Sequence, residues 1–460
     1  MFDSGSFRDP SGRILRQDGK ILRAIFDQGV ANYAAARDAD IYRRAVSRGR
    51  LVDLRETDTS LLAGIDPALR VVLEHPRLPF ISYPYEWTFS GLKTAALLHL
   101  DLHLELLADD FTLSDATAYN VQFEGTQPIF IDHLSIVPYE DGALWVGQRQ
   151  FAMQFLNPLI LWAKRGVAPN TWYRGNVEGI APEDLTKLLG WREKASFTVL
   201  AHVVAQSWTY KRGVQAGLNA KTNTARKLSK PAFISILKSL RDYIAGLSYP
   251  GEKTIWSDYA GRNSYNDERR AAKHEFVAEL ARSSEPQMIF DLGCNTGDFT
   301  VTALENGAKS AVGFDFDFGA LEQAFSRFSK SGRPVLPLWL DATNPSPSQG
   351  WASKERKSLG ERADADALLA LAVIHHLAIA RNVPLDMAVD WLMNLAPVGI
   401  IEFPSKSDSM VQQLLSARTD IFPDYTEEAF LAHVRARGAI RAEKRLGENG
   451  RLLIQYDRRK

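Results

Sequence analysis

The segment 287–297 combines an apolar run with a glycine-rich turn, a pairing that can bind a nucleotide-like ligand. The run Met288–Leu292 predicts a buried strand. Gly293, Asn295 and Gly297 follow it, and these residue types turn sharply and let a ligand approach the backbone. A helical pattern comes next, over 298–304. Strand, glycine-rich turn and helix, in this order, hold such a ligand at the carboxyl end of the strand in a doubly wound sheet.

Polar side chains recur where the next apolar runs end. The run 310–315 ends in Asp315, 24 residues after Asp291, which is close to the spacing at which a second strand places a carboxylate on a ribose diol. An open α/β sheet builds its site at the carboxyl ends of its strands. Further strands are predicted over 335–340, 368–374 and 398–403, and they bring Asp341, the pair His375 and His376, and Glu402.

These residues resemble the class I S-adenosylmethionine (SAM)-dependent methyltransferases. The resemblance rests on the segment DLGCNTG (291–297), on Asp315 and on Asp341, and it extends over about residues 255–460. A helix predicted over 427–437 and strand-like runs over 439–446 and 451–456 match the hairpin that closes the sheet edge in this family.

The resemblance implies SAM as cofactor. Gly293 and Gly297 would pass close to its methionine part, with Asn295 where many members of the family have Gly; Asn tolerates left-handed backbone. Asp315 would hold the ribose hydroxyls and Asp341 the adenine amine. The implied cofactor-binding residues are Asp291, Gly293, Asn295, Gly297, Asp315 and Asp341.

Two other interpretations of the same residues remain open. A dinucleotide fingerprint requires a third Gly three residues after the second one, and the segment 293–298 lacks it. Alternatively, the acids merely cap helices of an ordinary α/β sheet. Acids after three consecutive strands, at matching positions, favour the cofactor site.

Methyl transfer from a sulfonium is an in-line displacement that chiefly requires alignment, plus a base when the acceptor holds a proton. His375 or His376 could be that base, or both could orient the loop and pack under the cofactor. Glu402 is the second candidate. Lys273, on a helix predicted over 269–281, could cover the methionine end of the cofactor or simply be solvated.

The composition is that of a globular protein with more than one domain. The chain has 460 residues, of which 45% are hydrophobic and 24% charged, and the 55 basic residues equal the 55 acidic ones. Balanced charge argues against a duplex-binding protein, and no apolar run is long enough to predict a membrane span. The single cysteine, Cys294, and the absence of a signal-peptide pattern favour a cytoplasmic enzyme.

We expect a methyltransferase domain over 251–460 and an α+β accessory domain over 1–250, rich in hairpins up to residue 90 and helical from 91. The segment 10–25 predicts a β-hairpin with its turn at Asp18 and Gly19. The basic stretch 211–230 predicts a mobile loop.

Asp115, Asn120 and Asp132 resemble the catalytic loop and metal-binding strand of kinase-like phosphotransferases. In that family the first Asp orients the acceptor hydroxyl, and the Asn and last Asp hold magnesium, so the resemblance implies Mg-ATP. The chain departs from the family pattern, because Arg23 stands where Lys is expected and His133 follows the metal-binding Asp. The alternative is an accessory hairpin with capped turns.

The segments Tyr83–Trp87, Asn120–Phe123, Gln150–Phe151 and Ala372–Leu377 also resemble a bacterial group of two-part methyltransferases, some associated with nodulation or surface carbohydrates. This implies a sugar or glycan hydroxyl, or another small molecule, as acceptor. Two alternatives remain: a bifunctional phosphotransferase–methyltransferase acting on a glycan end, and a binding protein whose N-terminal half senses a nucleotide or recruits a partner.

Overall fold

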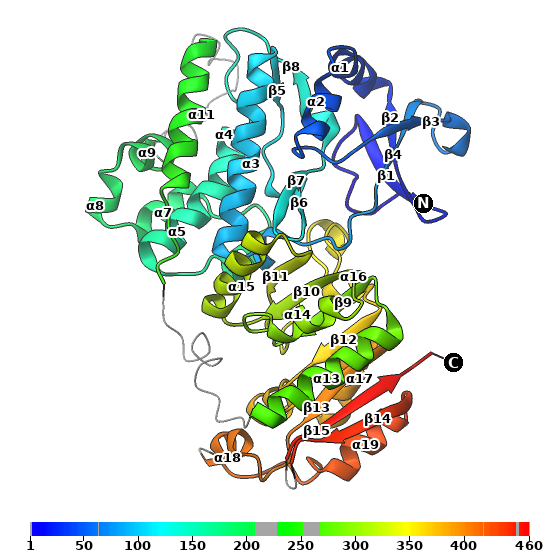
Figure 1. Cartoon of the computed structure of the whole chain (residues 1–460). Helices are drawn as coiled ribbons and strands as arrows, with labels where there is room; N and C mark the ends of the chain where they lie inside the picture. Colours follow the sequence, from blue (N-terminus) through cyan, green and yellow to red (C-terminus); the bar gives the residue numbers. More distant parts are fainter. Residues whose placement is uncertain are drawn as a thin grey trace. The chain divides into compact units, whose positions relative to one another are not determined.

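The computed structural model describes residues 2–62, 64–205, 207, 228–251, 267–416, 418–447 and 450–459. The chain forms two compact units (Figure 1). The N-terminal unit comprises Met1–Phe123, Gln127–Pro250 and Ser348–Arg356, and the C-terminal unit comprises Glu124–Thr126, Gly251–Pro347 and Lys357–Lys460. Residues 348–356 therefore fold with the N-terminal unit, although the chain on both sides of them belongs to the C-terminal unit.

The C-terminal unit contains the strands β9 (Met288–Leu292), β10 (Ser310–Asp315), β11 (Val335–Trp339), β12 (Ala367–Ala370), β13 (Val398–Phe403), β14 (Ala439–Arg445) and β15 (Leu452–Asp457). They form a seven-stranded sheet in the order β11-β10-β9-β12-β13-β15-β14. Strands β9 to β13 are parallel, and β15 is antiparallel to both β13 and β14. This is a doubly wound order whose direction reverses between β9 and β12. The predicted α/β class and the closing hairpin are confirmed.

The central strands of this sheet are buried on both faces. All five residues of β9 and all four of β12 are buried, which explains their near-continuous apolar character. Ile289, Leu369 and Ile400 join Phe276 and Phe328 from the helices in one core. The helices are α13 (Asp267–Ser284), α14 (Asp298–Glu305), α15 (Phe318–Ser331), α16 (Leu359–Arg362), α17 (Leu385–Asn394), α18 (Ser409–Ser416) and α19 (Glu427–Arg435).

One strand is shorter than its apolar run predicts. The run 368–374 was expected to form a single strand, but β12 ends at Ala370. Ala372 has φ of 57°, a left-handed conformation that takes the chain out of the sheet. His375 and His376 therefore lie beyond the strand, at the start of a single π-helical turn, His376–Ala380.

The N-terminal unit begins with an antiparallel sheet in the order β1-β2-β4-β3. The predicted hairpin is confirmed, with positive φ at Asp18 and Gly19 as its tight turn requires. Two short sheets, β5–β8 and β6–β7, follow. The strands are β1 (Gly12–Gln17), β2 (Lys20–Phe26), β3 (Arg55–Thr57), β4 (Leu69–His75), β5 (Phe111–Leu113), β6 (Val121–Glu124), β7 (Gln127–Phe130) and β8 (Ile136–Pro138).

Helices make up most of the remaining N-terminal unit. His99 and His103 on α3 are fully buried among aromatic rings, including those of Phe151 and Phe233. The α-helices are α1 (Asp27–Asp38), α2 (Ile41–Ser47), α3 (Phe89–Ala108), α4 (Gln148–Phe151), α5 (Asn157–Arg165), α6 (Asn170–Gly175), α7 (Pro182–Leu188), α8 (Trp191–Lys194), α9 (Phe197–Val199) and α11 (Lys230–Ala245). The expected mobile loop lies, from residue 211 to 227, outside the described residues.

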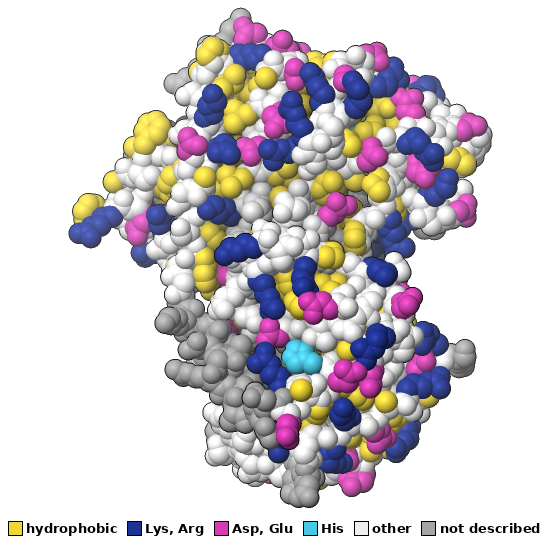
Figure 2. All heavy atoms as spheres, viewed as in Figure 1, with side chains coloured by type: hydrophobic (Ala, Val, Ile, Leu, Met, Phe, Trp, Pro, Cys, Tyr) yellow, Lys and Arg dark blue, Asp and Glu magenta, His cyan; other side chains and the backbone are white. Residues whose placement is uncertain are grey.

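Two features of the described residues bear on partners. No helix among them is both long and apolar enough to cross a membrane. On the face shown in Figure 2, basic and acidic side chains are interspersed, in keeping with the equal numbers of the two kinds.

Candidate functional site

A cavity of about 500 Å³ opens in the C-terminal unit beside the carboxyl ends of β9, β10, β11 and β12. Parallel strands end at one edge of a sheet, so residues that are far apart in sequence meet there. Most of the expected site residues line the cavity, whereas Asp291, Gly297 and Glu402 do not. The expected residues in its lining are Gly293, Asn295, Asp315, Asp341, His375 and His376.

The glycine-rich turn is held against the neighbouring strand. The backbone N–H groups of Gly293 and Cys294 both donate to the carbonyl oxygen of Phe314 on β10, over 2.8 and 3.0 Å. Gly297 has φ of 84°, and a Cβ at this position would overlap the ring of Phe328. Asn295 has φ of 50°, within the range that Asn tolerates. The turn therefore exposes backbone to the cavity.

Asp315 is bonded directly to this turn. Its Oδ2 accepts from the backbone N–H of Asn295 and its Oδ1 from that of Asp317, both over 2.9 Å. Burial raises the pKa of Asp315 to about 6. A carboxylate has about four acceptor sites, so Asp315 can accept further hydrogen bonds from a diol in the cavity.

Asp341 lies two residues after the end of β11, and only one of its two carboxylate oxygens accepts hydrogen bonds from described residues. Its Oδ1 accepts from the backbone N–H and the hydroxyl of Thr343, over 2.9 and 2.6 Å. Within the described part of the chain, its Oδ2 has no hydrogen-bond partner. That oxygen can accept from an amine in the cavity.

Two aromatic residues in the cavity lining were not predicted from the sequence. Phe316 directly follows Asp315 and is 56% exposed, an unusual degree for a large apolar side chain. Trp339 ends β11, stacks on Phe318 at 5.7 Å between ring centroids, and donates from Nε1 to the carbonyl oxygen of Phe316. An aromatic residue next to the acid at a strand end was the signal available in the sequence.

Asp291 supports the turn from inside the sheet. It is buried in β9, opposite Gly313 and Leu369 of the neighbouring strands, and accepts from the hydroxyl of Thr300 over 2.5 Å. Burial raises its pKa to about 7. This hydrogen bond ties α14 to β9, so the role of Asp291 toward the cavity is indirect.

Glu402 lies at the centre of a buried charge network. Its side chain is 0% exposed, its Oε2 is 2.6 Å from Lys273 Nζ, and its Oε1 is 3.3 Å from Arg451 Nη1. Arg451 also pairs with Asp408 at 2.8 Å. Burial by itself would raise the pKa of Glu402, but the two cations outweigh it and hold that pKa below its usual value. Both oxygens are engaged, so Glu402 orients Lys273 and Arg451, which line the cavity.

His375 and His376 lie against each other, with 4.2 Å between ring centroids. Burial lowers the pKa of both, that of His375 to about 3, and the nearby Arg451 lowers both further. Both imidazoles are therefore neutral at pH 7. Among the described residues, Nδ1 of His375 has no hydrogen-bond partner.

Cys294 is buried in the turn, and burial raises the pKa of its thiol well above the usual value. A buried thiol that stays protonated is a poor nucleophile, so Cys294 acts as a small space-filling residue of the turn.

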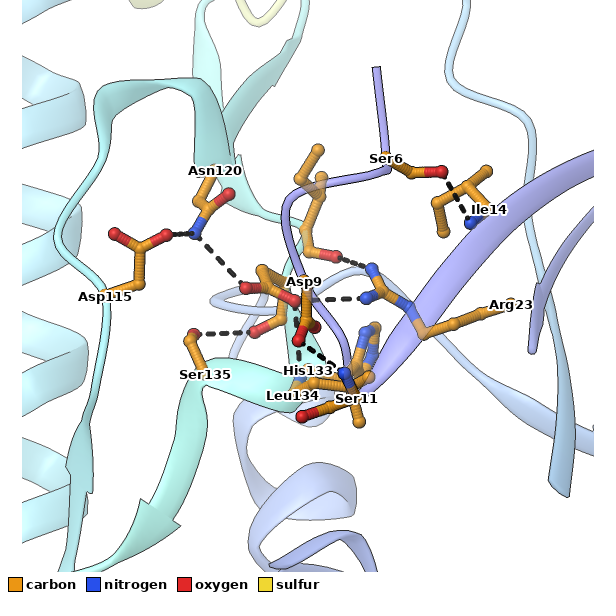
Figure 3. Close-up of polar contacts among 12 residues, drawn as sticks. Ser6, Asp9, Ser11, Ile14, Arg23, Asp115, Asn120, His133, Leu134 and Ser135 are labelled. Carbon is orange, nitrogen blue, oxygen red and sulfur yellow. Dashed lines mark hydrogen bonds and ion pairs between the residues drawn. The ribbon is translucent and has the colours of Figure 1, made fainter. Parts of the chain in front are cut away.

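In the N-terminal unit, Asn120 lies within hydrogen-bond reach of both Asp115 and Asp132, and Figure 3 shows Asp115 beside Asn120. The amide of Asn120 donates to Asp115 over 3.2 Å and to Asp132 over 3.3 Å. The backbone N–H of Ile131 donates to the carbonyl oxygen of Asn120 over 2.9 Å, which holds the chain before Asp132 beside Asn120. We call Asp115, Asn120 and Asp132 the acidic cluster. Its cation is Arg23 on β2, whose Nη1 lies 3.0 Å from Asp132 Oδ1.

Asp9 adds a third carboxylate next to the acidic cluster (Figure 3). Burial first, and then the charge of Asp132, raise the pKa of Asp9, and the same two causes raise that of Asp115. In the described ranges, no group of three or more His, Cys, Asp or Glu side chains has the arrangement of a metal site.

One known protein is similar to this chain over nearly the whole length of both. The chain is 46% identical over 457 residues to the nodulation protein NoeA of Rhizobium meliloti (strain 1021), covering 99% of this chain and 96% of that protein. No protein-family model matches the chain.

Solved structures match only part of the chain. The N-methyltransferase NodS from Bradyrhizobium japonicum WM9 in complex with S-adenosyl-L-homocysteine is 14% identical, with a TM-score of 0.31, over 41% of this chain and 87% of that one. The methyltransferase domain of bacterial CtHen1 is 15% identical, with a TM-score of 0.30, over 41% of this chain and 99% of that domain. WbdD is 14% identical, with a TM-score of 0.30, over 44% of this chain and 42% of that one. TM-scores this low do not support a functional assignment, which therefore depends on the geometry of the cavity.

The buried network yields a first prediction. Glu402→Ala should lower the free energy of unfolding by about 3–5 kcal/mol, because it leaves Lys273 and Arg451 buried without their shared partner. Urea unfolding followed by far-UV circular dichroism measures this. Glu443→Ala is the matched control, since Glu443 pairs with Arg435 at the surface and its loss should cost less than about 1 kcal/mol. Unchanged stability with lost methyl transfer would instead make Glu402 a base.

Proposed function

We propose that this chain, which belongs to the family of the nodulation protein NoeA, transfers a methyl group from SAM to a small-molecule or glycan acceptor in its C-terminal unit. The observation that carries this proposal is the convergence of the glycine-rich turn, Asp315 and Asp341 on one cavity. A backbone surface, a carboxylate for a diol and an acceptor for an amine match the three parts of SAM. The bound cofactor supplies an activated methyl group on its sulfonium.

The residues of the chain would hold SAM as follows. Gly293 and Asn295 present backbone to the methionine part, and Asp315 accepts from the ribose hydroxyls. Asp341 accepts from the adenine amine through its Oδ2. Phe316 offers an exposed ring beside this position, and flat apolar surface suits a base.

The acceptor side needs alignment and, for a hydroxyl acceptor, a proton acceptor. We propose His375 or His376 for that role, on a hydroxyl of a sugar, glycan or other small molecule. Burial keeps both imidazoles neutral and therefore able to accept a proton at pH 7, although a low pKa makes them weak bases. The resemblance of the chain to carbohydrate-associated methyltransferases supports a glycan.

The cofactor assignment predicts a pH-dependent affinity for SAM. The Asp315 carboxyl is protonated below a pKa of about 6 and ionised above it, so affinity should weaken about tenfold between pH 7 and pH 5. Asp315→Asn should weaken binding at pH 7 by about tenfold or more and remove this pH dependence. Calorimetric titration of SAM into both proteins measures this. Equal affinities in the two proteins would overturn the assignment.

Replacing both His375 and His376 with Ala should lower kcat by about 10²-fold, the low end of the usual contribution of a base, because a low pKa makes a weak base, and should leave SAM affinity unchanged. Because burial lowers both pKa values, wild-type kcat should stay constant from pH 8 down to pH 6.5. The measurement is transfer of labelled methyl from SAM to a glycan that the wild-type protein methylates. Retained turnover in the double variant would leave the two residues a packing role.

A second candidate function belongs to the N-terminal unit: metal-dependent binding of ATP, either for phosphoryl transfer to a glycan end or for sensing a nucleotide. The convergence of Asp115, Asn120 and Asp132 favours it. Asn120 and Asp132 would hold magnesium, and Asp115 would orient the acceptor hydroxyl. Arg23 neutralises Asp132 in the structure, so magnesium would have to share this carboxylate with a guanidinium.

Titration of Mg-ATP into SAM-saturated protein tests this second function. Asp132→Ala should abolish binding, because it removes a metal ligand. Asp38→Ala, an exposed acid on α1, is the matched control and should bind as the wild type does. If the wild type binds no Mg-ATP, the N-terminal unit has a structural or acceptor-presenting role.

A further inference from the structure

The basic residues lining the cavity of the C-terminal unit differ in their partners. Arg270 pairs with Asp298 at 2.9 Å, Lys273 pairs with Glu402, and Arg451 pairs with Glu402 and Asp408. Arg381 is exposed, lines the cavity and makes no hydrogen bond or ion pair with any described residue. Its guanidinium is therefore free to bind a ligand.

Among the described residues, no acid of the cavity lining is bonded to Arg381. Asp298 is bonded to both Arg270 and Arg327. The other two acids of the lining, Asp315 and Asp341, are committed to the ribose and adenine in the proposed function. SAM itself adds a sulfonium and an ammonium against one carboxylate. SAM therefore adds no net negative charge that could pair with Arg381.

The backbone that carries Arg381 is held in place. Arg381 directly follows the π-helical turn that begins with His376, so it belongs to the same loop as the proposed base. Arg418 donates to the carbonyl oxygen of Ile379 and, over 2.7 Å, to the side chain of Asn382. These bonds anchor the chain on both sides of Arg381, which lowers the entropic cost of using its side chain in binding.

We propose that Arg381 binds an anionic group of the acceptor, a carboxylate or a phosphate ester, and that the acceptor is therefore an acidic sugar or a comparable small anion. A guanidinium presents paired donors that match either group. The inference rests on the proposed methyl transfer and narrows its substrate class. The anionic group serves only for binding and orientation, and the methyl group is transferred to another atom of the same molecule.

Binding to protein saturated with S-adenosylhomocysteine tests the inference without turnover. The probes are glucose, glucuronate and glucose 6-phosphate, titrated by calorimetry. One or both anions should bind about tenfold or more tightly than glucose, since hydrogen bonds to charged groups are strong. Whether glucuronate or glucose 6-phosphate binds more tightly identifies the anion.

Variants at Arg381 make the test specific. Arg381→Gln should remove the preference for the anions, and Arg381→Lys should keep part of it. Arg435→Ala is the matched control, because Arg435 is an arginine of the same unit that does not line the cavity. The inference is overturned if the wild type binds the three sugars equally, binds none of them, or if Arg381→Gln keeps the preference. Failure of S-adenosylhomocysteine itself to bind would overturn the proposed methyl transfer instead.

Discussion

The central strand β9 pairs in parallel with β10 on one side and β12 on the other, and the candidate cofactor site depends on this pairing. It places the carboxyl end of β9, with its glycine-rich turn, between the ends of the two neighbouring strands. The turn is then bonded to β10 through the Phe314 carbonyl and the Asp315 carboxylate. A site of this kind needs little contribution from side chains in the turn itself, because the N–H groups of the turn bond within the turn and to β10, and two strand-end acids line the cavity.

The buried charge network connects α13 to the last strands of the C-terminal unit. Lys273 comes from α13, Glu402 from β13, and Arg451 directly precedes β15. Such a network stabilises little in total, because removing charges from water is costly, but it defines where its members lie. Burial lowers the pKa values of the two neighbouring imidazoles, and Arg451 lowers them further. The network therefore contributes two residues to the cavity wall, and its arginine helps to keep the candidate base neutral.

The N-terminal unit incorporates residues 348–356, although the chain on both sides of them belongs to the C-terminal unit. Glu355, whose side chain is 3% exposed, forms a two-pronged ion pair with Arg8 at 2.6 and 2.9 Å. Arg356, next to it, places its guanidinium over the ring of Tyr119 at 4.0 Å. A fragment that ends at residue 250 would lack both contacts. The acidic cluster, with Arg23 as its cation, lies in this same unit.

The sequence by itself determined the sheet and the position of two acids at its strand ends, because both follow from local pattern and chain order. Apolar runs predicted β9, β10 and β13 to the residue, and parallel order then placed Asp315 and Asp341 at one edge. Only the tertiary structure decided the state of the charged groups. Glu402 meets Lys273 across 129 residues and Arg23 meets Asp132 across 109. Ion pairs between such distant residues leave no periodic trace, so the engaged Glu402, the neutral histidines and the unpaired Arg381 emerge only when the chain is folded.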